Sequence, residues 1–295
     1  MKKLILSLVL FLLIASSQTQ AQFDKPVIQF GVGLVQPFGD LKGDQFTINT
    51  PFPLQPTFTT TRVDTALWAS HYGAKTGFSI FGSGKINFDK YNIFRAAATV
   101  SYNSFNSFQG AVSGNQVRVY YPNYVAVPIT YNYSFTDLGI GIGLEIAPTA
   151  FTNVVSPFIG ANITFNSFTS TVTRNTTYND SVSASVSGFR IGATLNAGIE
   201  AKFTSQFGGV IGIKYDLGNL LLRSTANSNY GDVIQWGAMN GNLNDEQGSY
   251  YSNVSNDQTD ANYYQYQSKK KDINWGTIYI GLNYYINGGT TPKKK

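Results

Sequence analysis

Residues 275–286 read WGTIYIGLNYYI. Apolar or aromatic side chains fill the even positions of this stretch from residue 278 onward, namely Ile278, Ile280, Leu282, Tyr284 and Ile286. The odd positions between them are Thr277, Tyr279, Gly281 and Asn283. Strict alternation with a period of two predicts an extended strand whose two faces meet different environments.

The same alternation recurs along the chain, and we expect five further strands from it, at residues 28–36, 68–88, 94–103, 189–203 and 211–218. Nearly every charged residue inside these segments falls on the less apolar face. In segment 68–88, for example, the pattern places Tyr72 on the apolar face and Lys75 on the polar one. Long strands that are apolar on one side and polar on the other are typical of a closed antiparallel transmembrane β-barrel.

The first residues carry the features of a secretion signal. Lys2 and Lys3 precede an apolar run at 4–15, and Thr19 and Ala21 are small residues suited to a cut before Gln22. A retained helical anchor is the alternative, although the run is short for a span of about 20 residues. We therefore expect a signal peptide at 1–21, an outer-membrane barrel at 22–286 and a polar tail at 287–295.

Composition agrees with strands that face lipid. The chain of 295 residues holds 29 Gly, 19 Tyr and 21 Phe, and only 13% of its residues are charged. Part of the net charge of +5 comes from the signal and from the three lysines at the end of the tail, so no nucleic-acid partner is expected. The chain has no cysteine, which excludes disulfides. No apolar run after the signal approaches the length of a membrane helix, so insertion must be as a barrel.

The segment 125–146 changes phase. Its apolar residues stand at odd positions up to Phe135 and at even positions from Leu138 onward. The change at Thr136 and Asp137 predicts either a β-bulge inside one long strand or a tight turn between two strands. With a further strand at 157–169, the bulge gives eight strands. The turn gives nine, which would require a tenth because such barrels have even strand numbers.

The lengths of the connections favour eight strands. Short connections are expected at 89–92, 148–156 and 205–208, and long ones at 39–67, 109–121, 174–185 and 223–271. With eight strands the long and short connections alternate along the chain. Short turns belong on the periplasmic side of such barrels, so the long connections are expected to be extracellular loops.

The segments FGVGLVQPFGD, VPITYNYSF, SPFIGANITFN and WGTIYIGLNYYI resemble the small outer-membrane barrels of Bacteroidota, in particular the PorT-like and outer membrane protein beta-barrel domain families. The resemblance covers the whole mature chain. It implies a multi-pass barrel in the bacterial outer membrane. Its motifs are strand signatures, so it implies no specific activity.

Charged residues gather on the inner faces of the expected strands. We predict a charge network in the lumen from Lys75, Lys85, Arg95, Glu145, Arg190, Glu200, Lys202, Lys214 and Asp216. The interior of an eight-stranded barrel is only wide enough for side chains to fill it, so these charges must pair or remain hydrated. Glu145 and Glu200 are expected within reach of Arg95, Arg190, Lys75 or Lys214. Because six bases face three acids, a narrow anion-preferring path is the alternative.

The sequence offers little support for catalysis or metal binding. His71 is the only histidine, and the neighbouring Ser70 would lie on the opposite face of a strand. We therefore predict no enzyme activity, no cofactor and no metal site. Acidic residues in loop 223–271 could bind calcium, but no EF-hand spacing is present. In the same loop, aromatic residues are candidate contacts for a partner: Trp236, Tyr263, Tyr264 and Tyr266.

Two functions fit these features. The first is a non-enzymatic barrel with a charge-filled lumen and a structural or interaction role through its extracellular loops. The second is a narrow porin-like channel for small solutes. The expected partners are outer-membrane lipid and lipopolysaccharide, with a cell-envelope or extracellular protein as a further candidate.

Overall fold

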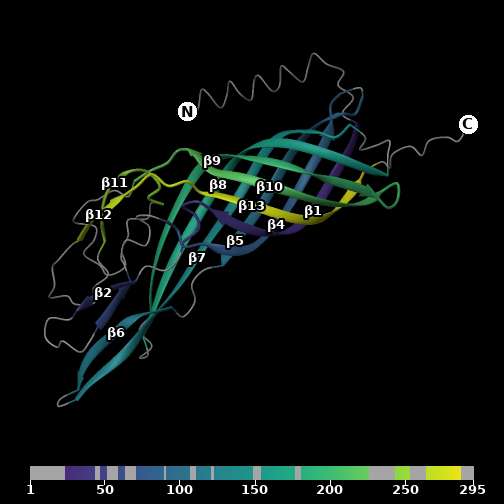
Figure 1. The fold of residues 1–295 in the computed structure, drawn as a ribbon. Coiled ribbons are helices and arrows are strands. Elements are labelled where there is room, and N and C mark those ends of the chain that lie inside the picture. Colours follow the sequence, from purple (N-terminus) through teal and green to yellow (C-terminus); the bar gives the residue numbers. More distant parts are fainter. Residues whose placement is uncertain are drawn as a thin grey trace, which may run out of the picture.

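Eight long antiparallel strands close into a barrel in the computed structural model (Figure 1). The structure describes residues 24–43, 47–51, 59–63, 71–89, 91–106, 111–120, 123–148, 154–176, 181–225, 243–252 and 264–286. The barrel strands are β1 (Asp24–Phe38), β4 (Lys75–Asn87), β5 (Phe94–Asn106), β7 (Asn123–Ile146), β8 (Val155–Thr176), β9 (Ser181–Lys202), β10 (Phe207–Leu221) and β13 (Asn274–Tyr285). Each pairs with its neighbours in the order β5-β4-β1-β13-β10-β9-β8-β7, and β7 pairs with β5 to close the ring. The expectation of eight strands is confirmed.

Five shorter strands lie in the long connections, which the sequence pattern had treated as loops. Strand β6 (Ala111–Tyr120) pairs with the first part of β7 and extends that hairpin beyond the barrel (Figure 1). Strands β2 (Thr47–Pro51) and β3 (Thr59–Val63) form a hairpin, as do β11 (Gly248–Ser252) and β12 (Tyr264–Ser268). Within the described residues, no helix is long and apolar enough to cross a membrane. The expected signal peptide and the polar tail lie outside the described residues.

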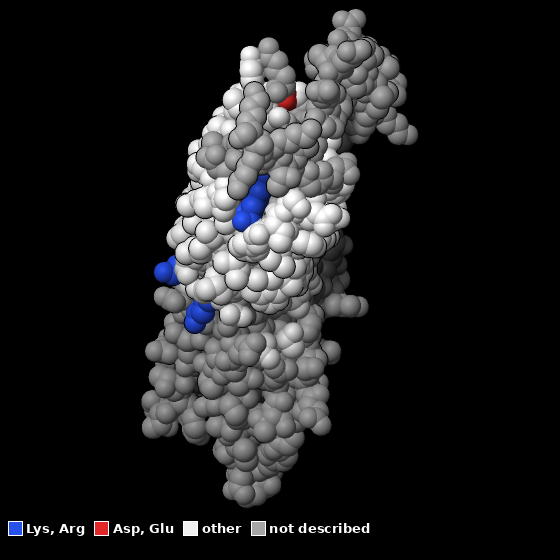
Figure 2. Space-filling model, turned by 90° about the vertical axis from the view of Figure 1, so that its right-hand side faces the viewer, with Lys and Arg blue, Asp and Glu red and all other residues white. Residues whose placement is uncertain are grey.

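The outer face of the barrel is a continuous apolar band. In β13, Ile278, Ile280 and Leu282 are exposed, whereas Thr277 and Tyr279 are buried in the lumen. The other strands repeat this alternation, and Figure 2 shows one side of the molecule on which few of the described residues are charged. Such a band is the surface that meets the hydrocarbon of a membrane. The short connections, which hold residues 88–93, 147–154 and 203–206, share one end of the barrel, and by their length this end is periplasmic.

Strand β7 is continuous through Thr136 and Asp137, so the expected bulge there is wrong. Its pairing with β8 keeps one register from Ile129 to Ile146, and its pairing with β5 shows no shift. Odd residues face the lumen from Tyr133 to Glu145, the part of the strand whose side chains are described. The backbone pairing therefore stays the same at this point, and what changes is which face of the strand is apolar. In the part of β7 that follows Asp137, which is the lower part of the barrel, the outer face is apolar. In the part that precedes Asp137, the inner face is apolar.

This reversal divides the barrel into two levels along its axis, which we call the lower and the upper story. In the upper story the outward residues are polar: Asn132, Ser134, Thr136, Ser167, Thr169, Ser185 and Ser187. The inward residues there form an aromatic cluster that includes Tyr72, Phe105, Phe135, Phe168 and Trp275. Neighbouring rings in the cluster lie 5.2–6.1 Å apart between centroids. A sheet that stands in water outside must bury its apolar side chains inside, so the upper story projects beyond the lipid.

Two residues of the segment 68–88 face the opposite way from the expectation. The register between β4 and β5 shifts between Lys75 and Phe78, so that Lys75 and Thr76 are both exposed. Such a β-bulge breaks the alternation, and it places Lys75 outside the lumen. Tyr72 lies before the bulge. It was expected on the apolar outer face but is fully buried in the aromatic cluster.

Candidate functional site in the barrel lumen

Four charged side chains from four strands meet in the lower lumen, and we call them the lumen quartet: Lys85 of β4, Arg95 of β5, Glu145 of β7 and Glu200 of β9. Lys85 Nζ lies 3.0 Å from Glu145 Oε2 and 3.1 Å from Glu200 Oε1. Arg95 Nη1 donates to Glu200 Oε2 at 3.0 Å, and Arg95 Nη2 is hydrogen bonded to both glutamates. None of the four side chains is more than 3% exposed. The two bases and two acids compensate each other's charge.

The quartet crosses the whole lumen. Strands β4 and β9 are four places apart in the closed order of eight, so Lys85 and Glu200 reach each other from opposite walls. The ring of Phe158 packs against this layer with its centroid 4.7 Å from Lys85 Nζ. Buried charges without partners are costly, and here each base contacts both acids. The quartet is therefore a charge-balanced layer across the barrel.

A small polar chamber lies between the quartet and the aromatic cluster. Its volume is about 40 Å³, which is room for about three waters. Asp137 and Asp216 line it, and Lys214 borders it. Asn103 Nδ2 donates to Asp137 Oδ2 at 2.9 Å, and the Thr194 hydroxyl is hydrogen bonded to Asp216. Lys214 Nζ lies 3.4 Å from the centroid of the Phe81 ring.

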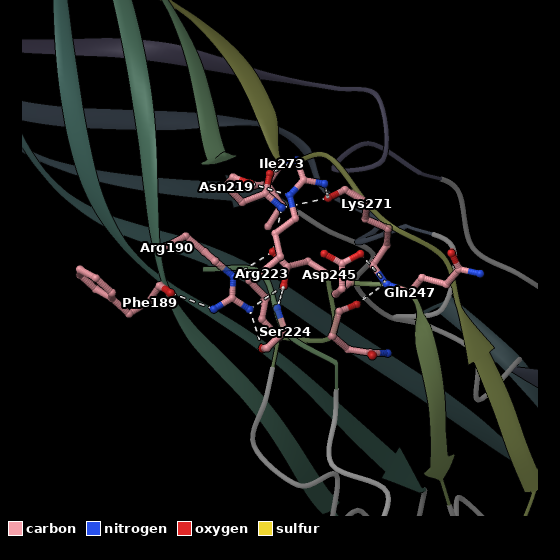
Figure 3. A network of polar contacts seen from close by, with 12 residues as sticks. Phe189, Arg190, Asn219, Arg223, Ser224, Asp245, Gln247, Lys271 and Ile273 are labelled. Carbon is pink, nitrogen blue, oxygen red and sulfur yellow. Dashed lines mark hydrogen bonds and ion pairs between the residues drawn. The ribbon is translucent and has the colours of Figure 1, made fainter. Parts of the chain in front are cut away.

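The extracellular mouth is closed by residues 243–245, which we call the mouth latch. Asp245 is the centre of a polar network (Figure 3). Arg190 Nε donates to Asp245 Oδ2 at 2.8 Å, and Asn219 Nδ2 donates to the same oxygen at 2.8 Å. The backbone N–H of Ser224 donates to Asp245 Oδ1 at 3.0 Å. The latch thus joins β9, β10 and the segment that follows β10.

Further contacts hold the latch from the segments that precede β4 and β13. The Tyr72 hydroxyl donates to the carbonyl of Leu243 at 2.9 Å, and Leu243 is fully buried in the aromatic cluster. Lys271 Nζ donates to the carbonyl of Asn244, and the backbone N–H of Lys271 donates to that of Asp245 at 3.1 Å. A peptide segment that is packed and hydrogen bonded in this way is part of the fold.

Two groups of the mouth have shifted pKa values. Burial opposes ionisation of Asp245, but hydrogen bonds from Arg190 and Asn219 outweigh it and hold the pKa of Asp245 below its usual value. Burial lowers the pKa of Lys271 from 10.5 to about 8, although the charges of Asp245 and Asp40 act in the opposite direction. The folded protein therefore releases the Lys271 proton at a lower pH than the unfolded chain does.

We expect this shift to make the stability rise with pH between about 8 and 10.5. In that range the unfolded chain binds a proton at Lys271 that the folded protein does not, so the free energy of unfolding increases with pH. The Lys271→Met variant should lose this rise. The measurement is the urea midpoint in detergent across the range, and Lys270→Met, which removes an exposed lysine that does not contribute to the shift, is the control. Equal slopes for wild type and Lys271→Met would contradict the expectation.

The structure places the other expected lumen charges at different heights. Arg190 lies at the mouth and pairs with Asp245 instead of Glu145 or Glu200. Lys202 lies at the periplasmic end, with Nζ 5.0 Å from the centroid of the Tyr285 ring. Lys75 is outside, as described above. Of the bases expected to reach the two glutamates, only Arg95 contacts them. The second base that contacts the glutamates is Lys85, which was not among those expected to do so.

Among the described lumen residues the expected excess of three bases over acids is reduced to one. Pattern reading placed Asp137 in a bulge or turn and Asp245 in a free loop, so it missed two inward acids. The odd positions before Glu145 are three glycines and then Asp137. Continuing the alternation from Glu145 towards lower residue numbers would therefore have put Asp137 on the inner face. With these changes, and with Lys271 buried at the mouth, six bases face five acids along the described lumen: Lys85, Arg95, Arg190, Lys202, Lys214 and Lys271 against Asp137, Glu145, Glu200, Asp216 and Asp245.

The expected loop contacts are not tested by the structure. Trp236 and Tyr263 lie outside the described residues, and Tyr264 and Tyr266 are described only by their backbone pairing in β12. In the described part of the chain, no three His, Cys, Asp or Glu side chains are grouped so that they could hold a metal ion.

Comparisons with known proteins give one matching family and several similar structures. Residues 5–239 match the family model of the outer membrane protein beta-barrel domain. Neisserial surface protein A is similar at 10% identity, over 88% of this chain and 98% of that chain, with a TM-score of 0.38. OprG from Pseudomonas aeruginosa is similar at 9% identity, over 89% and 95%, with a TM-score of 0.43. Ail of Yersinia pestis is similar at 10% identity, over 89% and 98%, with a TM-score of 0.35. No curated protein matches the sequence.

Proposed function

Since the chain belongs to the outer membrane protein beta-barrel domain family and is located in the bacterial outer membrane, we propose that it is a closed, non-enzymatic scaffold that presents its long loops outside the cell. The observation that carries the proposal is the lumen quartet. Its salt bridges cross the barrel from β4 and β5 to β7 and β9. An ion or solute could pass only if these bonds opened.

Two further layers support a closed lumen. Above the quartet, the rings of the aromatic cluster fill the upper story. Above these, the mouth latch bonds to both sides of the opening. An eight-stranded barrel is narrow enough for side chains to fill it, and three successive filled layers agree with a scaffold instead of a pore.

The purified protein should therefore show no single-channel conductance in a planar lipid bilayer. The physical reason is that the quartet must lose charged hydrogen bonds before the lumen can open. Glu200→Gln removes one negative charge of the quartet and tests whether conductance appears when its salt bridges are weakened. The matched control is Asp272→Asn, which removes a carboxylate at the exposed rim. Discrete, reproducible conductance steps from the wild-type protein would contradict the proposal.

The binding role is proposed for the connection between β10 and β13, with Trp236, Tyr263, Tyr264 and Tyr266 as candidate contacts. Loops on a rigid barrel can vary without disturbing the scaffold, and aromatic side chains add contact area at small entropic cost. The expected partner is a cell-envelope or extracellular protein, and lipopolysaccharide and lipid surround the barrel. This loop should carry the interaction together with residues 39–67.

Deleting residues 248–268 should leave folding intact and remove partner binding. Gly248 pairs with Ser268 in the β11–β12 hairpin, so a short glycine-rich link can rejoin the chain there while the mouth latch and Lys271 remain. The measurements are heat-modifiable migration on SDS gels, which reports folding, and cross-linking on intact cells, which reports partners. A variant that keeps every wild-type cross-link would contradict the binding role, and one that fails to fold would make the hairpin part of the scaffold.

The polar chamber favours a second candidate, a narrow path for small solutes. Its walls are lined with hydroxyl, amide and carboxylate groups, such as Thr194, Asn166 and Asp216. The bases of the described lumen outnumber its acids by one, which is a small electrostatic motive for a preference for anions. The conductance measurement separates this candidate from the scaffold.

We also infer that the barrel is of the Bacteroidota type, close to the PorT-like family. Support comes from the strand segments that resemble those barrels, above all FGVGLVQPFGD at the start and WGTIYIGLNYYI at the end of the mature chain.

A further inference from the structure

Four exposed lysines stand at the extracellular end of one wall of the barrel, and we call them the basic rim: Lys42, Lys75, Lys269 and Lys270. Lys42 follows β1 and pairs with Ala74, the residue before Lys75. Lys269 and Lys270 precede β13, and Lys269 Nζ lies 2.7 Å from Asp40 Oδ1. Strands β4, β1 and β13 are neighbours in the sheet, so the four lysines belong to one side of the mouth.

The described charges of the rim have a positive excess. The carboxylate of Asp40 accepts from Lys269 and, at 3.0 Å, from the backbone N–H of Asp272. Asp272 itself pairs with Arg223 at 2.6 Å, so these two charges cancel. Four lysines and Asp40 then leave three positive charges, and two remain even when Glu246, which follows the mouth latch, is counted. An exposed surface with one sign of charge attracts a partner of the opposite sign.

The lipid-facing band ends just below the rim on this wall. Leu34 pairs with Phe78 on one side and with Ile278 on the other, and all three are exposed apolar side chains. On the mouth side of this row, the Thr76 hydroxyl donates to Gln36 Oε1 at 2.5 Å. This polar pair on the outer surface marks the border between hydrocarbon and headgroups.

The rim lies within reach of the lipid headgroups. Lys75 is three positions from Phe78, which is at most about 10 Å along the strand. The polar layer of a bilayer extends about 5–8 Å beyond the hydrocarbon. A lysine stem is long and flexible enough to place its ammonium at the polar side of such a border. The ammonium groups of the rim can therefore meet the phosphates of lipids in the outer leaflet.

The opposite wall has a different surface above the lipid. Strands β9, β8 and β7 lie four places from β4, β1 and β13 in the closed order of eight. Their described outward residues in the upper story are hydroxyl and amide side chains, and none of them is charged. Lipid surrounds both walls, so the contrast between them indicates that an anionic headgroup is held on one side.

From this placement we propose that the basic rim binds an outer-leaflet lipid whose sugar headgroup carries phosphates, the chemistry of lipid A. The inference rests on the proposed scaffold in the outer membrane and assigns a site to one of its lipid partners. Each phosphomonoester carries a charge of about −1.5 to −2 at neutral pH, so three positive charges balance most of the charge of two phosphates. Ammonium groups bind phosphate as point charges and need no fixed geometry, which suits exposed lysines. The acyl chains of the lipid lie along the row of Leu34, Phe78 and Ile278.

The test is a titration of the purified protein in detergent micelles with diphosphoryl lipid A, followed by native mass spectrometry. The same lipid A without its phosphates is the second probe. The wild type should bind the phosphorylated lipid at least about tenfold more tightly, because each lysine near an anionic lipid contributes about fivefold in affinity. Replacing all four lysines of the rim by glutamine should weaken this binding by about a hundredfold.

Matched variants separate charge from other effects. The four lysines replaced by arginine keep the charge and should bind no more weakly than the wild type. Single replacements, Lys75→Gln and Lys270→Gln, should each weaken binding by about fivefold, so the test holds even if the fourfold variant fails to fold. Removing three hydroxyls of the opposite wall, with Ser134→Ala, Thr169→Ala and Ser187→Ala together, should leave the affinity unchanged.

The deletion of residues 248–268 keeps all four lysines and should retain the lipid. Loss of a protein partner in that variant is therefore distinguishable from loss of the lipid. Equal affinity of the wild type for the two forms of lipid A would overturn the proposal, as would wild-type affinity in the fourfold glutamine variant. Loss of binding in the variant of the opposite wall would place the lipid there and reject the assignment. Tighter binding of heparin, a soluble sulfated glycan, than of lipid A would mean that the rim takes a soluble polyanion instead.

Discussion

Replacing Arg95 by methionine should lower the free energy of unfolding by about 3–5 kcal/mol, the usual cost of breaking a buried ion pair by removing one partner. Arg95 is fully buried and bonds to both Glu145 and Glu200. Without it, Lys85 must balance two carboxylates alone. One negative charge then remains in the lower lumen, and its cost appears directly in stability.

The matched variant removes charge in compensating pairs. In Arg95→Met combined with Glu200→Gln, Lys85 and Glu145 remain as a single pair, so the double variant should be more stable than Arg95→Met alone. Urea unfolding in detergent, followed by tryptophan fluorescence, measures both. If the two losses simply add, the quartet does not act as a coupled unit. A surface pair would contribute only about 0–1 kcal/mol, so an Arg95→Met cost in that range would also count against the argument.

Replacing Phe135 by alanine should cost about 3–5 kcal/mol. Phe135 is fully buried in the upper story, and its ring lies 5.2 Å from that of Tyr72 and 5.7 Å from that of Phe168. Its removal leaves a cavity that these rings cannot fill, since Phe168 lies in a strand that is paired on both sides and the Tyr72 hydroxyl is bonded to the carbonyl of Leu243. The same unfolding measurement applies.

The control for this variant is Phe203→Ala. Phe203 is 68% exposed on the outer face of the barrel, next to a short turn, so its loss creates no cavity. If Phe135→Ala costs no more than Phe203→Ala, the aromatic cluster does not stabilise the upper story.

The alternation of side chains was sufficient to predict the strands and their inner and outer faces where lipid surrounds the barrel. In β13, each outward residue from Ile278 to Tyr284 and each buried one between them follows the pattern of the sequence. The reason is physical, because lipid admits only apolar side chains on the outside of a strand. Arg95, Glu145 and Glu200 could be placed in the lumen on the same ground.

The pattern failed where lipid ends. At Phe135 the sequence rule inverts because water lies outside and the apolar core lies inside, and a rule that assumes lipid everywhere interprets this as a change of register. Lys75 was misplaced because a bulge is invisible to strict alternation. Asp245 could not be found as a partner of Arg190, since nothing local in sequence indicates that a distant loop segment returns into the mouth.

The reversal of polarity also fixes the height of the barrel relative to the bilayer. Leu138 pairs with Ser167, and Ser167 with Phe189, so the border between lipid-facing and water-facing residues crosses β7, β8 and β9 near this row of paired residues. Sliding outward by two residues, about 7 Å along a strand, would lift Leu138 and Phe189 into water. Sliding inward would draw Thr136 and Ser187 into hydrocarbon. Both displacements place side chains in the wrong solvent and so cost free energy. The barrel is therefore held at one depth in the bilayer, and its mouth stands at a constant distance above the lipid headgroups.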